Sequence, residues 1–281
     1  MCGITAFFAR ESTPDIKHLD MLFTGAEKRG QDGFGFVIIR NEKNGRHIRT
    51  VFKDHRKYSD CREDVLNVFK NEPLGIGDAV IAICRASPET EPATDPLRVN
   101  ETVQPIVNLD EGLVVAHNGA VSQKIYNELK NWSGDDDDES TPVAYKYGTD
   151  IDSEALICNY IKHGRNMKDC MESLSGGFAA IMYDQNKDML YVMNDHMQIS
   201  HGYVRGLGFF LHSDVELLRD VIHDYTGCSR DGVNMWECYY AHYLSGGRIK
   251  QIDLQSGFMQ NIKYTPRYIT PAFDTIKGVI K

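Results

Sequence analysis

The sequence contains no apolar run close to the roughly 18 residues that a membrane-spanning helix needs. Its start, Met1-Cys2-Gly3-Ile4, lacks the basic residues and the long apolar stretch of a secretory signal. Positive charge is also scarce, because 31 Lys and Arg face 40 Asp and Glu, for a formal net charge of −9. This deficit disfavours binding to nucleic-acid backbones and to anionic membrane surfaces. We therefore expect a cytoplasmic protein.

The pattern of cysteines and histidines indicates neither a disulfide framework nor a metal site. The cysteines are odd in number, widely scattered and never spaced as CxxC. His196 and His201 lie five apart, which does not match the usual ligand spacings. A G-x-x-x-x-G-K-[ST] phosphate-binding loop is also absent. We therefore expect no metal and no cofactor.

The overall composition is that of an ordinary globular protein. Of 281 residues, 42% are hydrophobic and 25% are charged, so the chain can bury a large core and is not disordered as a whole. No Pro- or Gly-rich linker divides it, and we expect one domain over residues 1–281. Short apolar runs predict strands at 4–8, 34–39, 79–84, 113–116, 178–183, 190–193 and 209–212.

Helical periodicity alternates with these strands. Apolar spacing predicts helices within residues 16–26, 121–132, 157–161, 167–174 and 217–225. The strands at 178–183 and 190–193 flank a polar turn at 184–188, which favours a hairpin and antiparallel sheet. Together these patterns predict a layered α+β protein.

Two segments have the composition of surface loops. Residues 87–100 hold three of the nine prolines and several acids. Residues 133–146 contain five consecutive acids at 135–139, which repel one another and are typical of a solvated loop. A calcium site is the alternative, but the run lacks the alternating acids and closing Glu of a calcium-binding loop.

Cys2 is a candidate nucleophile because of its position. A small second residue permits removal of Met1, which would place a thiol and a free α-amine on one residue. The α-amine has a reference pKa of about 7.7–8.0, so part of it is neutral near pH 7 and can act as a base for the thiol. No separate histidine is then needed for activation. The dipeptide Cys2-Gly3 alone is weak support, since many proteins carry Cys at position 2.

From Cys2 onward the chain resembles the class II glutamine amidotransferases, which are N-terminal-nucleophile hydrolases. Each matching segment is short, but the matches follow the order of the family and span roughly residues 2–215. The matching segments are CGI at 2–4, RGQDGFG at 29–35, ICRAS at 83–87, QP at 104–105, HNG at 117–119, DSE at 152–154 and GGFA at 176–179.

The resemblance implies a fold and a reaction. The fold is a four-layer αββα sandwich with two mainly antiparallel sheets. The reaction is attack of Cys2 on the side-chain amide of L-glutamine, which releases ammonia and leaves a glutamyl thioester. The Asn118 side chain and the Gly119 backbone N–H would stabilise the oxyanion. From the residues alone, Asn118-Gly119 also fits a hairpin turn.

The same resemblance implies how free glutamine would be held. Arg85 would bind its carboxylate, although a surface ion pair is the structural alternative. Asp152 would bind its ammonium; it could also be a helix N-cap, and Asp150 is a nearby competitor. Arg29 and His117 complete the predicted substrate-binding set, as residues that support the nucleophile region and the HNG segment.

The chain departs from the family pattern in three places. Ala86-Ser87-Pro88 stands where a threonine usually follows the arginine, and Ser87 or Thr90 could substitute for it. The 34 residues from Asn118 to Asp152 suggest an insertion that includes the acidic run. Fused family members also carry an acceptor domain, for which this chain has no room. We therefore expect a separate synthetase or transferase subunit to receive the ammonia.

Two other function classes stay open. One is an N-terminal-Cys hydrolase of another amide, against which the Arg85 and Asp152 pair argues, because it suits a free amino acid. The other is a non-catalytic module that keeps the fold for regulation or assembly. The intact residues Cys2, Asn118 and Gly119 argue against that alternative.

Overall fold

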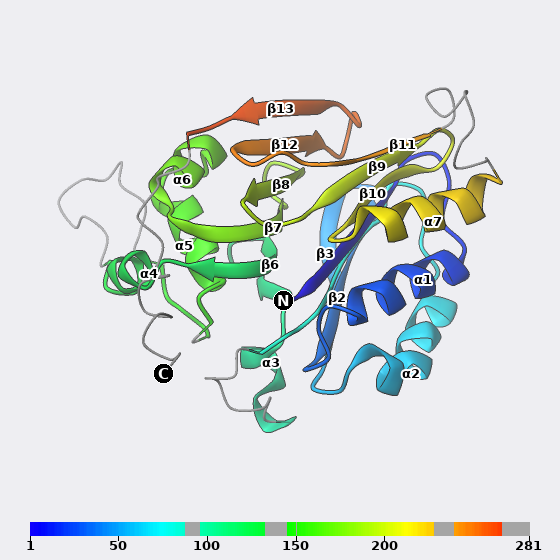
Figure 1. Ribbon diagram of the computed structural model, residues 1–281, viewed down its shortest axis with the longest axis horizontal. Helices are drawn as coiled ribbons and strands as arrows, with labels where there is room; N and C mark the ends of the chain where they lie inside the picture. The colour runs from blue at the N-terminus through cyan, green and yellow to red at the C-terminus, as the bar shows by residue number, and fades with distance from the viewer. Residues whose placement is uncertain (88–95, 133–144, 150, 228–238, 266–281) are drawn as a thin grey trace, which may run out of the picture.

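The computed structural model describes residues 1–87, 96–132, 145–149, 151–227 and 239–265. They form two antiparallel sheets that pack face to face, with helices on both outer faces (Figure 1). Three apolar clusters hold the layers together, one between the sheets and one beneath each helical layer. This arrangement confirms the predicted four-layer αββα sandwich.

The first sheet carries the N-terminus. Helices α1 (Ile16–Glu27), α2 (Tyr58–Asn71) and α7 (Val215–Thr226) cover its outer face. Because both faces are covered, β1 and β4 are buried along their whole length, which explains their almost entirely apolar sequences. In spatial order its strands are β11 (Tyr239–Tyr243), β9 (Ser200–Val204), β10 (Gly208–His212), β1 (Gly3–Ala9), β4 (Ala79–Cys84), β2 (Phe34–Glu42) and β3 (Gly45–Asp54).

The second sheet packs against helices α4 (Gln123–Lys130), α5 (Glu154–Lys162) and α6 (Met167–Ser173). Before its first strand, the 3-10 turn η1 (Pro96–Arg98) leads into α3 (Val99–Thr102). No helix of the described residues is long and apolar enough to cross a membrane. In spatial order the strands are β13 (Met259–Lys263), β12 (Arg248–Asp253), β8 (Met189–Asp195), β7 (Gly176–Asp184), β6 (Leu113–Val121) and β5 (Ile106–Asn108).

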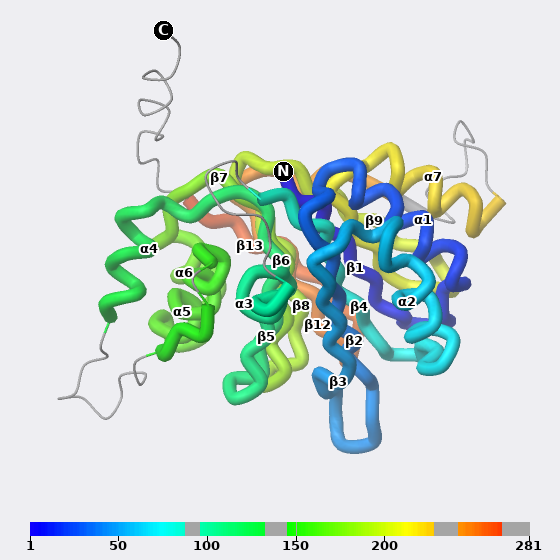
Figure 2. The backbone as a smooth tube through the Cα atoms, turned by 90° about the horizontal axis from the view of Figure 1, so that it is seen from below, coloured from blue at the N-terminus to red at the C-terminus, as the bar shows by residue number. Residues whose placement is uncertain are grey.

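Every predicted strand lies within an observed one, and the predicted hairpin is β7–β8. The helix expected within 121–132 is shorter, because Val121 still pairs with Gly176 as the last residue of β6. Strands β3, β5, β9, β11, β12 and β13 and helices α2 and α3 were not predicted. Figure 2 shows the two sheets from below; β1 begins at the N-terminus, and it contacts β6 of the other sheet. The start of β1 therefore faces the strand that carries Asn118.

Candidate active site

Cys2 lies immediately before β1 and is only 9% exposed. The backbone N–H of Ala86 points at its Sγ atom at 3.3 Å. Burial raises the pKa of the Cys2 thiol, while the Ala86 N–H, the terminal ammonium of Met1 and the Arg85 guanidinium lower it. The carboxylate of Asp152 acts in the opposite direction. One cation and one anion of the predicted site therefore both lie within electrostatic range of the thiol.

Glycines allow α1 and the loop after it to pack closely around Cys2. A Cβ atom on Gly3 would lie 2.1 Å from the carbonyl oxygen of Ala26, near the end of α1. A Cβ atom on Gly30 would lie 2.3 Å from the carbonyl oxygen of Cys84. Arg29, which directly precedes Gly30, donates through Nε to the carbonyl oxygen of Cys2 at 3.4 Å. Arg29 therefore contacts the backbone of the nucleophile.

Asn118 and Gly119 lie inside β6, where they pair with Ala179 and Phe178. The interpretation of Asn-Gly as a hairpin turn is therefore wrong. Gly119 has φ +118°, and a Cβ atom there would lie 2.1 Å from the carbonyl oxygen of Gly177. A side chain is excluded at this position both by the backbone angle and by the neighbouring strand.

The Asn118 side chain joins the two sheets at the nucleophile. It is 1% exposed, and its Oδ1 atom accepts a hydrogen bond of 2.8 Å from the backbone nitrogen of Cys2. Its Nδ2 atom is buried and has no hydrogen-bond partner among the described residues. A buried donor without a partner is costly, so such a group indicates a place for a missing acceptor.

The DSE segment supports β6 on either side of Asn118. Asp152 accepts a hydrogen bond of 3.0 Å from the Val121 backbone through Oδ2. Ser153, and not Asp152, is the N-cap residue of α5, and its Oγ atom lies 2.8 Å from Nδ1 of His117. Burial lowers the pKa of His117, partly offset by Asp152. His117 is 1% exposed, and its described contacts are those of a packed support.

Arg85 follows β4 and is 6% exposed. Its backbone N–H donates to the carbonyl oxygen of Gly33, and its carbonyl oxygen accepts from the N–H of Asp32, both at 2.8 Å. The Asp32 carboxylate also accepts from the N–H of Ser87 at 2.8 Å. The Ser87 Oγ atom is buried without a partner among the described residues. Pro88, Thr90, Asp150 and the acidic run at 135–139 lie outside the described residues.

Two polar residues of the quoted motifs have structural roles that the sequence analysis did not assign. Gln104 forms two buried hydrogen bonds with the backbone of His117. Glu154 is 3% exposed and accepts from the backbone N–H groups of Gly148 and Thr149 at 2.8 and 2.7 Å. Both residues lie in quoted motifs, and this was the signal that the sequence offered. Their hydrogen-bond partners were not predictable, because they are distant in the sequence or lie in a loop.

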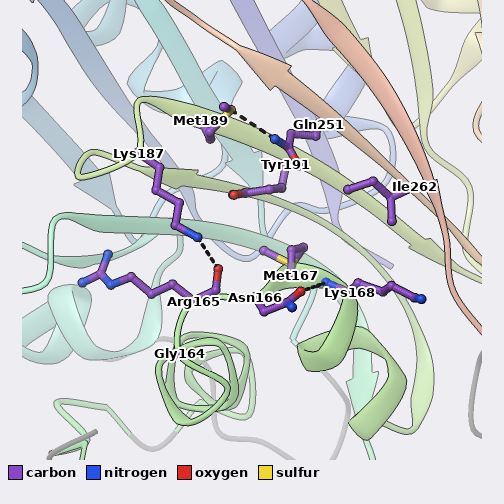
Figure 3. A pocket seen from close by; sticks show the side chains of 10 residues that line it. All are labelled: Gly164, Arg165, Asn166, Met167, Lys168, Lys187, Met189, Tyr191, Gln251 and Ile262. Atoms are coloured by element: carbon purple, nitrogen blue, oxygen red, sulfur yellow. Dashed lines mark hydrogen bonds between the residues drawn. The ribbon is translucent and has the colours of Figure 1, made fainter. Parts of the chain in front are cut away.

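A separate cavity of about 280 Å³ lies where the α5–α6 connection meets the outer face of β8 and β12 (Figure 3). Lys187 donates to the carbonyl oxygen of Arg165 at 2.5 Å beside it. No predicted site residue lines this cavity. Among the described residues, no group of three or more His, Cys, Asp or Glu is arranged to hold a metal ion.

Comparison with known proteins relates part of the chain to a family. A family model described as "Glutamine amidotransferase domain" matches residues 94–220. Glutamine–fructose-6-phosphate aminotransferase (isomerizing) of Streptococcus mutans is 24% identical over 240 residues, 80% of this chain and 35% of that protein. 7-cyano-7-deazaguanine synthase 2 of Sulfurisphaera tokodaii is 24% identical over 229 residues, 77% of this chain and 44% of the relative.

A solved structure shares the fold. The glutamine phosphoribosylpyrophosphate amidotransferase of B. subtilis, in complex with ADP and GMP, matches with a TM-score of 0.63 and 18% identity. The match covers 94% of this chain and 49% of that protein. This chain therefore spans less than half the length of each of these three proteins.

Proposed function

We propose that the chain, whose residues 94–220 match the glutamine amidotransferase domain family, hydrolyses L-glutamine to glutamate and ammonia at Cys2. The observation that carries the proposal is the junction of Cys2 and Asn118. The 2.8 Å hydrogen bond between them brings to the nucleophile a buried donor that has no partner within the described part of the chain. We take residues 1–281 as one glutaminase domain.

The proposed reaction begins once Met1 has been removed. In the structure Met1 precedes Cys2, and burial keeps the Cys2 thiol protonated by raising its pKa. Removal of Met1 turns the nitrogen of Cys2 into an amine, which takes the thiol proton as the sulfur attacks the amide carbon. The proton then passes to the departing nitrogen, and ammonia leaves. Water hydrolyses the thioester and restores the thiol.

The developing negative charge is the main electrostatic demand of this reaction. In the proposal, Asn118 Nδ2 and the Gly119 backbone N–H donate to the oxyanion of the tetrahedral intermediate. Both groups come from a part of β6 that pairs with β7, so they need no reorganisation as the charge forms. This is the arrangement in which an oxyanion donor is most effective.

The proposed substrate is a free amino acid with a charge of each sign. Arg85 binds its carboxylate and Asp152 binds its ammonium. The opposite effects of these two residues on the pKa of the Cys2 thiol support this assignment, because they place both charges near the nucleophile. The buried hydroxyl of Ser87 supplies a further hydrogen bond in place of the family's threonine. Arg29 fixes the backbone of Cys2 through its hydrogen bond to the carbonyl oxygen. His117, which precedes Asn118 in β6, anchors this strand to Ser153.

We further propose that the ammonia is used by a separate synthetase or transferase subunit. The two curated relatives bear the names of an aminotransferase and a synthase, and only 35% and 44% of their lengths match this chain. We therefore assign the ammonia-accepting reactions of these two relatives to the parts of their chains that do not match this protein. Stable co-purification of such a subunit, with faster glutamine hydrolysis in the complex, would support this step.

The direct test combines intact mass with a glutamine-like electrophile. Purified protein is weighed and then treated with 6-diazo-5-oxo-norleucine, with and without glutamine. We expect loss of Met1 and one adduct on Cys2 that glutamine prevents. Cys2→Ala should abolish both labelling and glutamate release, and Cys61→Ala, which alters a buried thiol of α2, should retain both.

The alternatives predict other outcomes of the same test. Retained Met1 without labelling would contradict the proposal and favour a non-catalytic module. A processed Cys2 that reacts with iodoacetamide, but is neither protected by glutamine nor able to hydrolyse it, would favour a hydrolase of another amide.

A further inference from the structure

Strand β5 is too short to pair with the part of β6 that leads into Asn118. Its ladder with β6 comprises three residue pairs and ends at Ile106 and Val115. His117 lies two residues farther along β6 on the same side. Its backbone N–H and C=O would therefore need another partner, because His117 is 1% exposed.

The side chain of Gln104 takes the place of the missing strand. Its Oε1 atom accepts from the N–H of His117 at 2.7 Å, and its Nε2 atom donates to the carbonyl oxygen of His117 at 3.1 Å. This is the two-bond exchange that a residue of an antiparallel neighbour would make. Gln104 is 4% exposed, so water does not compete freely for either bond.

The backbone of the same residue rests on the other sheet. A Cβ atom at Gly35, in β2, would lie 2.3 Å from the carbonyl oxygen of Gln104. Gly35 pairs with Ile83 of β4, and Ile83 pairs in turn with Ile4 of β1. The series of paired residues that starts at the Gln104 contact, Gly35, Ile83 and Ile4, thus ends two sequence positions from Cys2. The contact requires glycine, which allows the two backbones to approach each other closely.

We propose that Gln104 is a positioning residue that sets the distance between the nucleophile on one sheet and the oxyanion donors on the other. This inference rests on the proposed roles of Cys2 and Asn118. Gln104 contacts neither the thiol nor Asn118 by a described hydrogen bond, and it acts through His117 and Gly35. Misplacement of a reacting group by about 1 Å can reduce a rate by about 100-fold, so a small shift of β6 is sufficient to impair turnover.

The test replaces the Gln104 amide and separates its effect on turnover from its effect on Cys2 itself. Gln104→Met keeps the length of the side chain but removes both hydrogen bonds. Gln104→Glu keeps the acceptor for the His117 N–H and removes the donor. Gln123→Met is the matched control, because Gln123 is an exposed glutamine at the start of α4, which follows the same strand.

Three quantities are measured in each variant: kcat, KM for glutamine, and the rate at which iodoacetamide alkylates Cys2. Alkylation is a direct displacement that needs no oxyanion donor. We expect Gln104→Met to lower kcat by about 10- to 100-fold, with KM and the alkylation rate within about twofold of the wild type. Gln104→Glu should also lower kcat, and Gln123→Met should change none of the three. An unchanged kcat in Gln104→Met, or an equal fall of kcat and alkylation, would overturn the proposal.

A spectroscopic measurement keeps the inference separate from the proposed function. The side-chain amide of Asn118 gives its own pair of resonances in a ¹⁵N-labelled protein. In Gln104→Met these resonances should shift or broaden, while those of exposed Asn127 stay in place. If the wild type fails to hydrolyse glutamine, the proposed function falls, and unchanged Asn118 resonances would still refute the positioning role. If Gln104→Met does not fold, the same comparisons are made with Gln104→Asn, which keeps the amide but shortens its reach.

Discussion

The replacement Asn118→Asp isolates the oxyanion donor from the rest of the site. Aspartate has the same shape as asparagine and keeps an oxygen where Oδ1 accepts the 2.8 Å bond from Cys2. It replaces the buried Nδ2 donor by a second oxygen. The substitution therefore removes one function of Asn118 and retains the other. Asn118→Ala, by contrast, removes both.

The expected loss of kcat follows from the proposed role of Asn118 Nδ2 as an oxyanion donor. Removal of one oxyanion-hole donor costs about 10²- to 10³-fold in kcat, or about 2.7–4 kcal/mol of transition-state stabilisation. A carboxylate at Asn118 would also repel the oxyanion in a buried site, so we expect the upper end of this range. KM for glutamine should change little, because the charge on the oxygen develops only in the transition state.

The assay is steady-state release of glutamate, with the alkylation of Cys2 by iodoacetamide as a check that the nucleophile is intact. Asn127→Asp, on the exposed face of α4, is the matched control for the added negative charge and should behave as the wild type. If Asn118→Asp kept more than a tenth of the wild-type kcat, the assignment of Nδ2 to the oxyanion would be refuted.

Three further variants test the supports of the site and one buried charge. Gly119→Ala should destabilise the fold by about 3 kcal/mol or more, seen as a lower Tm, because its Cβ would lie 2.1 Å from the Gly177 carbonyl oxygen; an unchanged Tm would refute the fit. Ser153→Ala should cost about 1–3 kcal/mol in urea melts by leaving buried Nδ1 of His117 without its partner, and Ser153→Thr should restore part of it. Burial lowers the pKa of Lys250 to about 8, so between about pH 8 and 10.4 this residue binds more protons in the unfolded chain than in the folded one, and its contribution to stability rises with pH. Lys250→Met should therefore be more stable than the wild type near pH 7 by a margin that shrinks towards pH 10, whereas an equal margin in melts at pH 7 and 10 would contradict the assignment.

Seven of the strands were predictable because the sandwich covers both faces of each sheet. A strand such as β4 is then apolar at every position, and its limits coincide with the apolar run in the sequence. Strand β3 was missed for the opposite reason. It lies at the edge of its sheet, carries several exposed or half-buried polar residues, and has no continuous apolar run.

The candidate site was predictable as a set of motifs but not as a geometry. The order of the motifs predicted that Cys2, Arg85, Asn118 and Asp152 belong to one site. The local preference of Asn-Gly for a turn nevertheless failed, because the ladder of β6 with β7 continues through both residues to Val121. Here strand pairing overrides local propensity. Gly119 has a positive φ but stays in the strand, because β6 pairs with β7 at this position.

The remaining features depend on contacts between distant parts of the chain. Cys2 and Asn118 are 116 residues apart, and they meet only because the first sheet lies on the second. Their distance is therefore set by whatever fixes the sheets against each other and by the register of β6. A slip of one residue along β6 would turn Asn118 away from Cys2, because successive side chains point to opposite faces of a sheet. Gln104, whose amide holds His117 and whose carbonyl oxygen rests on Gly35, opposes both kinds of displacement. No local pattern around Gln104 could indicate this role, since it exists only in the packed sandwich.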